Sequence, residues 1–277
     1  MTNVSVLMSV YKNERPEYLN QALQSVWTDQ TVKPNQIVLV EDGPLTEALY
    51  LVISSWKKLL GDILYIIENE QNLGLTKSLN RGICAINSEY IARMDSDDIS
   101  LPLRFEKQVN YLETHPDVDV IGGSMQEFND VCDCLNVRHY PLTHQQVEKY
   151  IMKASPLAHP SVMMKKKLFD EGLKYNEKYR TSQDVALWFD VISAGYHIAN
   201  LEDIILLFRQ NNDVYSRRGR AKAWNECKIY INGIYRLKGL FTWKYIYPLL
   251  RLFFRLMPSS IVKFIYESKL RNRLLKR

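Results

Sequence analysis

Three carboxylates within four residues form the most chemically distinctive segment of the chain. Asp95, Asp97 and Asp98 follow the apolar run Tyr90–Met94 and would repel one another unless a positive charge lay between them. Carboxylate oxygens are hard ligands that favour Mg²⁺ or Mn²⁺, and a cation held by one or two of them keeps open positions for substrate phosphates. The segment therefore predicts a metal site for phosphate chemistry. The alternative is a solvated acidic turn that caps the next helix.

Two other polar clusters also come directly after apolar runs. Residues 11–14 (Tyr-Lys-Asn-Glu) follow the run Val4–Val10, and residues 41–43 (Glu-Asp-Gly) follow the run Gln36–Val40. Because ligands of open α/β sheets bind at the carboxyl ends of parallel strands, we expect these clusters to meet the acidic segment at one edge.

The elements that would position these clusters alternate along the first half of the chain. Strands without strict alternation, separated by helices of ten or more residues, predict an α/β fold with a mainly parallel sheet covered on both faces. The expected strands are 4–10, 36–40, 63–67, 90–94 and 118–121, the last ending before Gly122-Gly123, and the expected helices are 17–27, 46–60, 75–86, 103–113 and 185–193.

Six motifs in order make the sequence similar to a known family. They are VSVLMSVYKNE, VLVEDG, NLGLTKSLNRGI, YIARMDSDD, HPSVM and SQDVALW. Over about residues 3–210 the chain resembles the family-2 glycosyltransferases of GT-A fold, particularly those that build bacterial surface polysaccharides. The resemblance implies an inverting enzyme that uses Mn²⁺ or Mg²⁺ and a nucleotide sugar, with a UDP-hexose (UDP-Glc or UDP-Gal) as the preferred donor.

The resemblance also implies a donor site and its metal ligands. Asp97 would ligate the metal, Asp95 would touch the ribose or the metal, and Asp42 would hydrogen-bond the uracil. Arg209 would clamp the diphosphate, although Asn211 stands where relatives have a histidine. Lys77 lies in the first turn of a helix, whose N-terminus suits phosphate. The full donor set is Ser9, Tyr11, Glu14, Asp42, Asn72, Gly74, Lys77, Asn80, Arg93, Asp95, Ser96 and Arg209.

The acceptor side of the site is implied by the last two motifs. Asp184 would act as the general base that removes the proton of the acceptor hydroxyl, so that an α-linked donor gives a β-linkage. A helix-capping carboxylate is the alternative for Asp184. Gln183 replaces an acid found in many relatives, which leaves a single carboxylate. His159 and Trp188 are the predicted acceptor-side residues, with a structural histidine and a packing tryptophan as alternatives.

Other classes of protein fit the motifs less well. A Mg²⁺-dependent phosphatase would carry its acidic motif after the first strand, and a nucleotidyltransferase would need a glycine-rich loop there, whereas residues 10–16 contain no glycine. A sugar-nucleotide binder without activity would not need Asp184. The four cysteines are too few and too irregularly spaced for a disulfide framework or a zinc site, as expected of a protein in a reducing compartment.

The C-terminal part differs from the rest in charge. Residues 1–208 carry 19 basic and 28 acidic side chains, whereas residues 209–277 carry 17 basic and 3 acidic ones. Helical patterns at 243–257 and 261–275 combine aromatic and aliphatic residues with a cationic stripe that includes Lys244, Arg251 and Arg255, which is typical of an interfacial membrane helix. The alternative is packing on the enzyme's own body or on a second subunit in a homodimer; the apolar face is too large for nucleic acid.

These patterns predict the organisation of the whole chain. We expect a GT-A catalytic domain over 1–210, with a nucleotide-sugar half (1–123) and an acceptor half (124–210), and a basic amphipathic helical region over 211–277. We expect no signal peptide and no membrane-spanning helix, because no apolar run of sufficient length is present. The basic helical region suggests peripheral membrane binding, and the family resemblance implies that the enzyme works on the cytoplasmic side of the cytoplasmic membrane and extends a saccharide on polyprenyl diphosphate.

Overall fold

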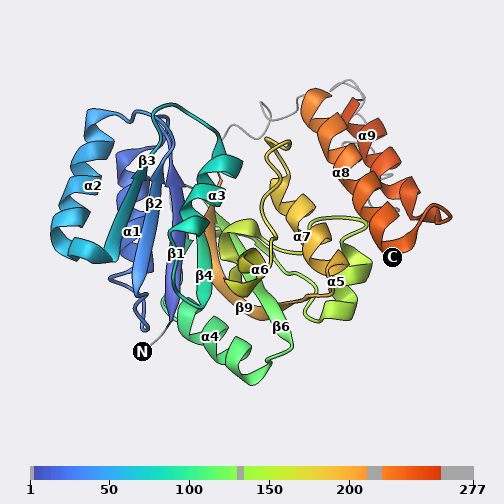
Figure 1. Ribbon diagram of the computed structural model, residues 1–277, viewed down its shortest axis with the longest axis horizontal. Helices are drawn as coiled ribbons and strands as arrows, with labels where there is room; N and C mark the ends of the chain where they lie inside the picture. The colour runs from blue at the N-terminus through green and yellow to red at the C-terminus, as the bar shows by residue number, and fades with distance from the viewer. Residues whose placement is uncertain (1–2, 130–133, 211–219, 257–277) are drawn as a thin grey trace. The chain divides into compact units, whose positions relative to one another are not determined.

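The computed structural model describes residues 3–129, 134–210 and 220–256. The chain forms two compact units, residues 1–211 and 212–277, and each is described here by itself. Figure 1 shows the order of the elements along the chain.

Unit 1 is built on a single mixed sheet whose first half is parallel. Four strands, β1 (Val4–Val10), β2 (Gln36–Glu41), β3 (Leu64–Glu68) and β4 (Tyr90–Asp95), pair in parallel in the order β3-β2-β1-β4. The sheet continues through β8 (Met163–Lys165), β6 (Val118–Phe128), β9 (His197–Arg209) and β5 (Ile99–Ser100), and β7 (Cys134–Arg138) pairs with β6. The carboxyl ends of β1, β2 and β4 thus lie side by side, as the sequence predicted.

Helices cover both faces of the parallel half (Figure 1). On one face, α1 (Pro16–Val26), α2 (Glu47–Leu60) and α4 (Arg104–Thr114) share a core with alternate β1 residues such as Val6 and Met8. On the other face, α3 (Leu75–Cys84) packs Gly82 against Leu7. The remaining helices of unit 1 are η1 (Gly61–Ile63), α5 (His144–Tyr150), η2 (His159–Ser161), α6 (Lys167–Asp170) and α7 (Gln183–Ser193).

Local signals account for two of the helix starts. Pro16 occupies the first helical position of α1, where its fixed φ suits the helix and its missing N–H leaves no bond unmade. Thr46 caps α2 by accepting a hydrogen bond from the Leu49 amide.

The second half of the sheet departs from the sequence prediction. The strand expected to end at residue 121 runs on to Phe128 and passes straight through Gly122 and Gly123. A Cβ added at Gly122 would lie 2.2 Å from the Asn200 Oδ1 atom, so glycine here permits close packing instead of a turn. The predicted boundary between residues 123 and 124 therefore falls inside β6. The short strand β8, which separates β4 from β6, was also not predicted.

Unit 2 contains α8 (Arg220–Lys238), η4 (Trp243–Tyr245) and α9 (Ile246–Leu256). Ala223 and Cys227 of α8 pack with Leu252 of α9. The Arg251 guanidinium lies 2.7 Å from Oε1 of Glu226 in α8, and the Arg255 guanidinium pairs with Oε2 of the same carboxylate.

Arg251 and Arg255 therefore share one side of α9, as the helical projection predicted, and both pair with Glu226 while their side chains stay 31% and 40% exposed. Pro248 lies in the first turn of α9. The second predicted helix, 261–275, lies outside the described residues. Among the described helices, none combines the length and apolar composition needed to cross a bilayer.

Candidate active site

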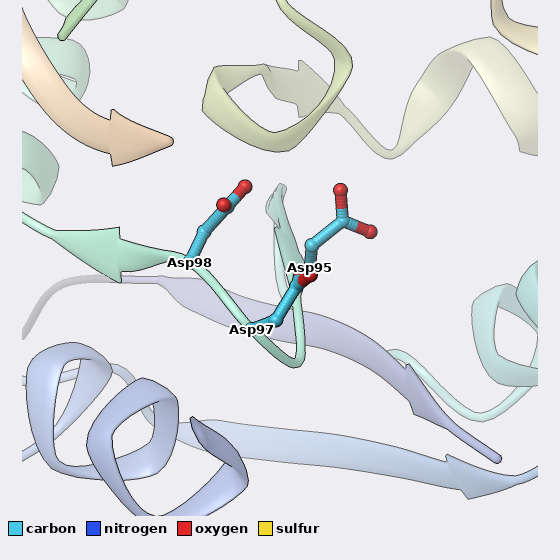
Figure 2. A group of neighbouring side chains, drawn as sticks. All are labelled: Asp95, Asp97 and Asp98. Carbon is cyan, nitrogen blue, oxygen red and sulfur yellow. The ribbon is translucent and has the colours of Figure 1, made fainter. Parts of the chain in front are cut away.

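The turn between β4 and β5 gathers three carboxylates. Asp95 ends β4, and Asp97 and Asp98 follow two and three residues later. Ligand oxygens of the three side chains all lie within 4.8 Å of one another, and Figure 2 shows them together on this turn. The parallel pairing of β4 with β1 places Ser9 opposite Asp95, so the acidic turn lies at the carboxyl edge of the sheet.

Burial and mutual repulsion raise the pKa values of carboxylates in this turn. Burial, followed by the neighbouring charges of Asp95 and Glu14, raises the pKa of Asp97 to about 7. Burial likewise raises the pKa of Asp98 well above its usual range, followed by the effects of Asp95 and Asp97. The buried Arg93 guanidinium forms an ion pair with Asp95. The raised pKa values of Asp97 and Asp98 indicate that the nearby cations do not balance the charge of the three carboxylates.

The residues of the turn fit a divalent cation. Asp98 is fully buried, and its Oδ2 atom has no hydrogen-bond partner among the described residues. A buried carboxylate oxygen without a partner is costly, and oxygen donors at this spacing are what Mg²⁺ and Mn²⁺ take as ligands. Asp98 was absent from the predicted ligand set. Its adjacency to Asp97 was visible in the sequence, but the direction of its side chain was not.

Arg209 holds this turn through two hydrogen bonds. Its guanidinium Nε donates to the Asp97 backbone oxygen at 2.8 Å, and its backbone amide donates to Asp98 Oδ1 at 2.9 Å. The guanidinium carbon also lies 3.9 Å from the ring centroid of Tyr18 and 4.4 Å from that of Phe128. The structure therefore gives Arg209 a buried, turn-holding role. Its predicted contact with a diphosphate stays a prediction.

The loop after β1 meets the acidic turn, as predicted. The Ser96 hydroxyl donates to Glu14 Oε2 at 2.5 Å. Tyr11 is 45% exposed at the start of the same loop, so its ring is available to a ligand. Ser9 is half-buried within β1. These side chains thus lie at one edge despite more than 80 residues of intervening sequence.

Asp42 has a structural task that the sequence prediction did not include. Its carboxylate accepts hydrogen bonds from the backbone amides of Leu73 at 2.7 Å and Gly74 at 3.0 Å. It also accepts one from the side-chain amide of Asn69 at 3.1 Å. It thereby holds the loop that leads into α3, with Gly74 at φ 86°. The Asn72 side chain donates to the Asp42 backbone oxygen at 3.1 Å. The contact of Asp42 with a nucleobase stays a prediction.

Lys77 is exposed in the first turn of α3, where a phosphate can reach it. Asn80, one turn further along, is hydrogen-bonded within the protein, and its predicted contact with a donor stays a prediction. Its side-chain amide bonds both backbone groups of Tyr175 and the Glu177 carboxylate.

Asp184 lies in the first turn of α7, directly after an unusual backbone conformation. Ser182 has φ 58°, a left-handed value that is rare for a residue other than glycine and that tends to occur at functional sites. Burial raises the pKa of the Asp184 carboxyl, hydrogen bonding to the Val185 amide and the Arg93 charge lower it, and Asp95 raises it again. Asp184 and the acidic turn therefore lie within electrostatic range of each other, as a shared site requires.

His159 and Trp188 lie beneath the site and not on its surface. Trp188 is fully buried, and its predicted contact with an acceptor stays a prediction. His159 Nε2 lies 2.8 Å from the hydroxyl of the fully buried Tyr175. Burial lowers the pKa of His159 well below its usual range, and the Arg93 charge adds to this effect. His159 is thus a neutral, hydrogen-bonded core residue, and Tyr175 is a site neighbour that no motif indicated.

The arrangement combines two functions of a group-transfer site. Carboxylates at the β4 turn suit a cation that would neutralise phosphate oxygens. A separate carboxylate with a raised pKa, Asp184, suits a general base.

Curated relatives resemble the chain over nearly its full length. It is 37% identical to the amylovoran biosynthesis glycosyltransferase AmsE of Erwinia amylovora, over 95% of this chain and 97% of that protein. It is 30% identical to the UDP-Gal:alpha-D-GlcNAc-diphosphoundecaprenol beta-1,3-galactosyltransferase of Escherichia coli, over 97% and 96% of the two chains.

Solved structures show the same fold at low sequence identity. Residues 1–349 of S. aureus TarS, crystallised with UDP, match with a TM-score of 0.66 and 18% identity over 99% of this chain and 77% of that one. The chain spans 46% of the full-length TarS chain. The model of the family described as Glycosyl transferase family 2 matches residues 5–173. The chain therefore belongs to glycosyl transferase family 2 and is a glycosyltransferase of GT-A fold.

Proposed function

We propose that the protein is an inverting hexosyltransferase that moves a hexose from a UDP-sugar, UDP-Gal or UDP-Glc, to a saccharide on a lipid diphosphate during synthesis of a surface polysaccharide. The observation that carries this proposal is the acidic turn Asp95–Asp98 within electrostatic range of Asp184. The names of the two relatives support the substrate classes: one acts in amylovoran biosynthesis, and the other uses UDP-Gal and a diphosphoundecaprenol acceptor.

The proposed division of labour follows from the placement of the side chains. Asp97 and Asp98, with Asp95, would hold Mn²⁺ or Mg²⁺, which when bound supplies positive charge to the departing diphosphate. Asp184 accepts the proton of the acceptor hydroxyl as that oxygen attacks the anomeric carbon from the face opposite the diphosphate. The C–O bond to the diphosphate breaks as the new C–O bond forms, so the anomeric configuration inverts.

The direct test is turnover of UDP-hexoses with Mn²⁺ and a synthetic lipid-diphosphate saccharide. We expect UDP release coupled to a β-linked product, identified by mass and by the anomeric coupling constant. Asp184→Asn should lower kcat about 10²- to 10⁴-fold, the usual contribution of general-base catalysis, and should leave UDP affinity nearly unchanged. Glu202→Gln, at an exposed acid of β9, is the matched control. An unchanged rate for Asp184→Asn would refute the base assignment.

We further propose that unit 2 binds the cytoplasmic face of the cytoplasmic membrane peripherally. Its α9 helix exposes Leu249, Leu250, Phe253 and Phe254, each between 46% and 60% exposed. Trp243 is 64% exposed beside Lys244, whose Nζ lies 3.9 Å from the indole centroid. Aromatic and aliphatic side chains beside cations suit the headgroup boundary of an anionic bilayer. At the membrane surface the enzyme would reach a lipid-linked acceptor.

Sedimentation with phosphatidylglycerol vesicles tests this surface. Replacing Phe253 and Phe254 with serine should weaken binding more than about tenfold, because each buried phenyl group contributes roughly 1.5–3 kcal/mol. Tyr50→Ser with Leu51→Ser, at exposed apolar residues of α2, is the control and should bind normally. Unchanged vesicle binding by the phenylalanine variant, or its conversion from a dimer to a monomer in light scattering, would contradict the membrane proposal, and the second result would assign the face to a homodimer.

A further inference from the structure

Helix α3 extends two polar side chains, one turn apart, toward a segment almost 100 residues later in the sequence. The Thr76 hydroxyl donates to the backbone oxygen of Tyr179 at 2.8 Å. The Asn80 amide nitrogen donates to the backbone oxygen of Tyr175 at 2.9 Å, and the Asn80 amide oxygen accepts from the Tyr175 backbone amide at 3.0 Å. Asn80 thus satisfies both backbone groups of one residue, as a neighbouring strand would.

The segment that these side chains hold has no regular structure of its own. Residues 173–182 form neither helix nor strand, and they lead directly to Asp184 in the first turn of α7. Backbone groups in such a segment need partners from elsewhere. Thr76 is 5% exposed and Tyr175 is fully buried, so these bonds lie largely out of water. The Tyr175 hydroxyl is bonded in turn to His159.

The N-terminal end of α3, where Thr76 lies, is held by the end of β2. Asp42, at the end of β2, binds the amides of Leu73 and Gly74 immediately before the helix. Exposed Lys77 lies between Thr76 and Asn80 in sequence. One helix of ten residues therefore connects the loop after β2 to the segment that carries Asp184.

We propose that Thr76 and Asn80 are positioning residues for glycosyl transfer, which fix the segment 175–182 so that Asp184 lies within reach of the acceptor hydroxyl. This inference rests on the proposed role of Asp184 as the base. It replaces the expectation that Asn80 binds the donor, because both ends of its amide are bonded to the segment before α7.

Isosteric variants test the two contacts. Thr76→Val removes the hydroxyl at nearly constant shape, Thr76→Ser keeps it, and Asn80→Asp loses the donor to Tyr175. We expect Thr76→Val and Asn80→Asp to lower kcat about 10- to 100-fold, the effect of a misplacement of about 1 Å. The KM for the UDP-sugar should change less than about threefold. Thr76→Ser should keep most of the wild-type kcat. Asn110→Ala, which removes an exposed side-chain amide of α4, should leave kcat unchanged.

A double-mutant cycle with Asp184→Asn separates positioning from general loss of structure. If the two residues act through Asp184, Thr76→Val should lower the residual rate of Asp184→Asn by less than about twofold. A drop in the double variant as large as in the wild-type background would overturn the inference and assign a structural role. Equal kcat for Thr76→Val, Asn80→Asp and wild type would also overturn it. An Asp184→Asn enzyme with full activity would instead refute the proposed base, whatever the Thr76 and Asn80 variants do.

Discussion

At the scale of single residues, aspartates at the same edge of the sheet have different environments and different tasks. Asp97 and Asp98 sit where burial and mutual repulsion raise their pKa, whereas Asp42 is saturated by backbone amides. The acidic run was visible in the sequence because three carboxylates in four residues are rare after a strand. The inward direction of Asp98 and of Arg209 was not visible in the sequence, because it depends on packing against Tyr18, Phe128 and β9.

A residue-scale prediction concerns Glu41 at the end of β2. Burial raises its pKa to about 7 from 4.5, and the charge of Glu68, its register partner on β3, contributes second. The folded protein therefore holds this proton more tightly than the unfolded chain does, and the stabilising contribution disappears as the pH rises toward about 7. Glu41→Gln should raise the free energy of unfolding by about 1–3 kcal/mol at about pH 8 and change it little near pH 4.5.

Denaturant unfolding of wild type and variant at the two pH values is the measurement. Glu68→Gln, which removes only the second contribution, should shift stability in the same direction by less. Equal differences between Glu41→Gln and wild type at both pH values would show that Glu41 does not titrate as described.

At the scale of elements, the parallel half was predictable and the mixed half was not. Strands β1 to β4 and helices α1 to α4 match the sequence prediction to within a few residues, because apolar runs and helical periodicity act locally. Strand β8 has only three residues, too few to give a periodic signal. Gly122 and Gly123 resembled a strand end in the sequence. In the structure these two positions have no room for a side chain, because Asn200 and Ile205 approach them closely. The partners of Thr76 and Asn80 are likewise distant in sequence.

An element-scale prediction concerns the contact of α3 with β1. A Cβ at Gly82 would lie 2.3 Å from Leu7 Cδ1 and 3.1 Å from Val40 Cγ2, both in the buried sheet. Gly82→Ala should therefore destabilise the protein by about 1–3 kcal/mol through overpacking, despite the better helix propensity of alanine. Adding Leu7→Val makes room, so the double variant should be more stable than the sum of the two single effects predicts. Strict additivity in thermal unfolding would contradict the described packing.

At the scale of the whole molecule, charge and exposed apolar surface are distributed unevenly along the chain. The first 208 residues have an excess of nine acidic side chains, and the remainder an excess of 14 basic ones. The amphipathic character of α9 was readable from its sequence. The orientation of α9 was not readable, because it depends on Glu226 of α8, which pairs with both Arg251 and Arg255, while Phe253 and Phe254 are left exposed.

The proposed chemistry requires that the chain bind a divalent cation together with a nucleoside diphosphate at the turn after β4. Titration of Mn²⁺ into the full-length protein with UDP, followed by the loss of the free-ion electron paramagnetic resonance signal, measures this directly. We predict that wild type binds Mn²⁺, that Asp97→Asn with Asp98→Asn weakens binding at least about tenfold, and that Glu113→Gln, an exposed acid of α4, binds as wild type does. Equal Mn²⁺ affinity for wild type and the double aspartate variant would contradict the account.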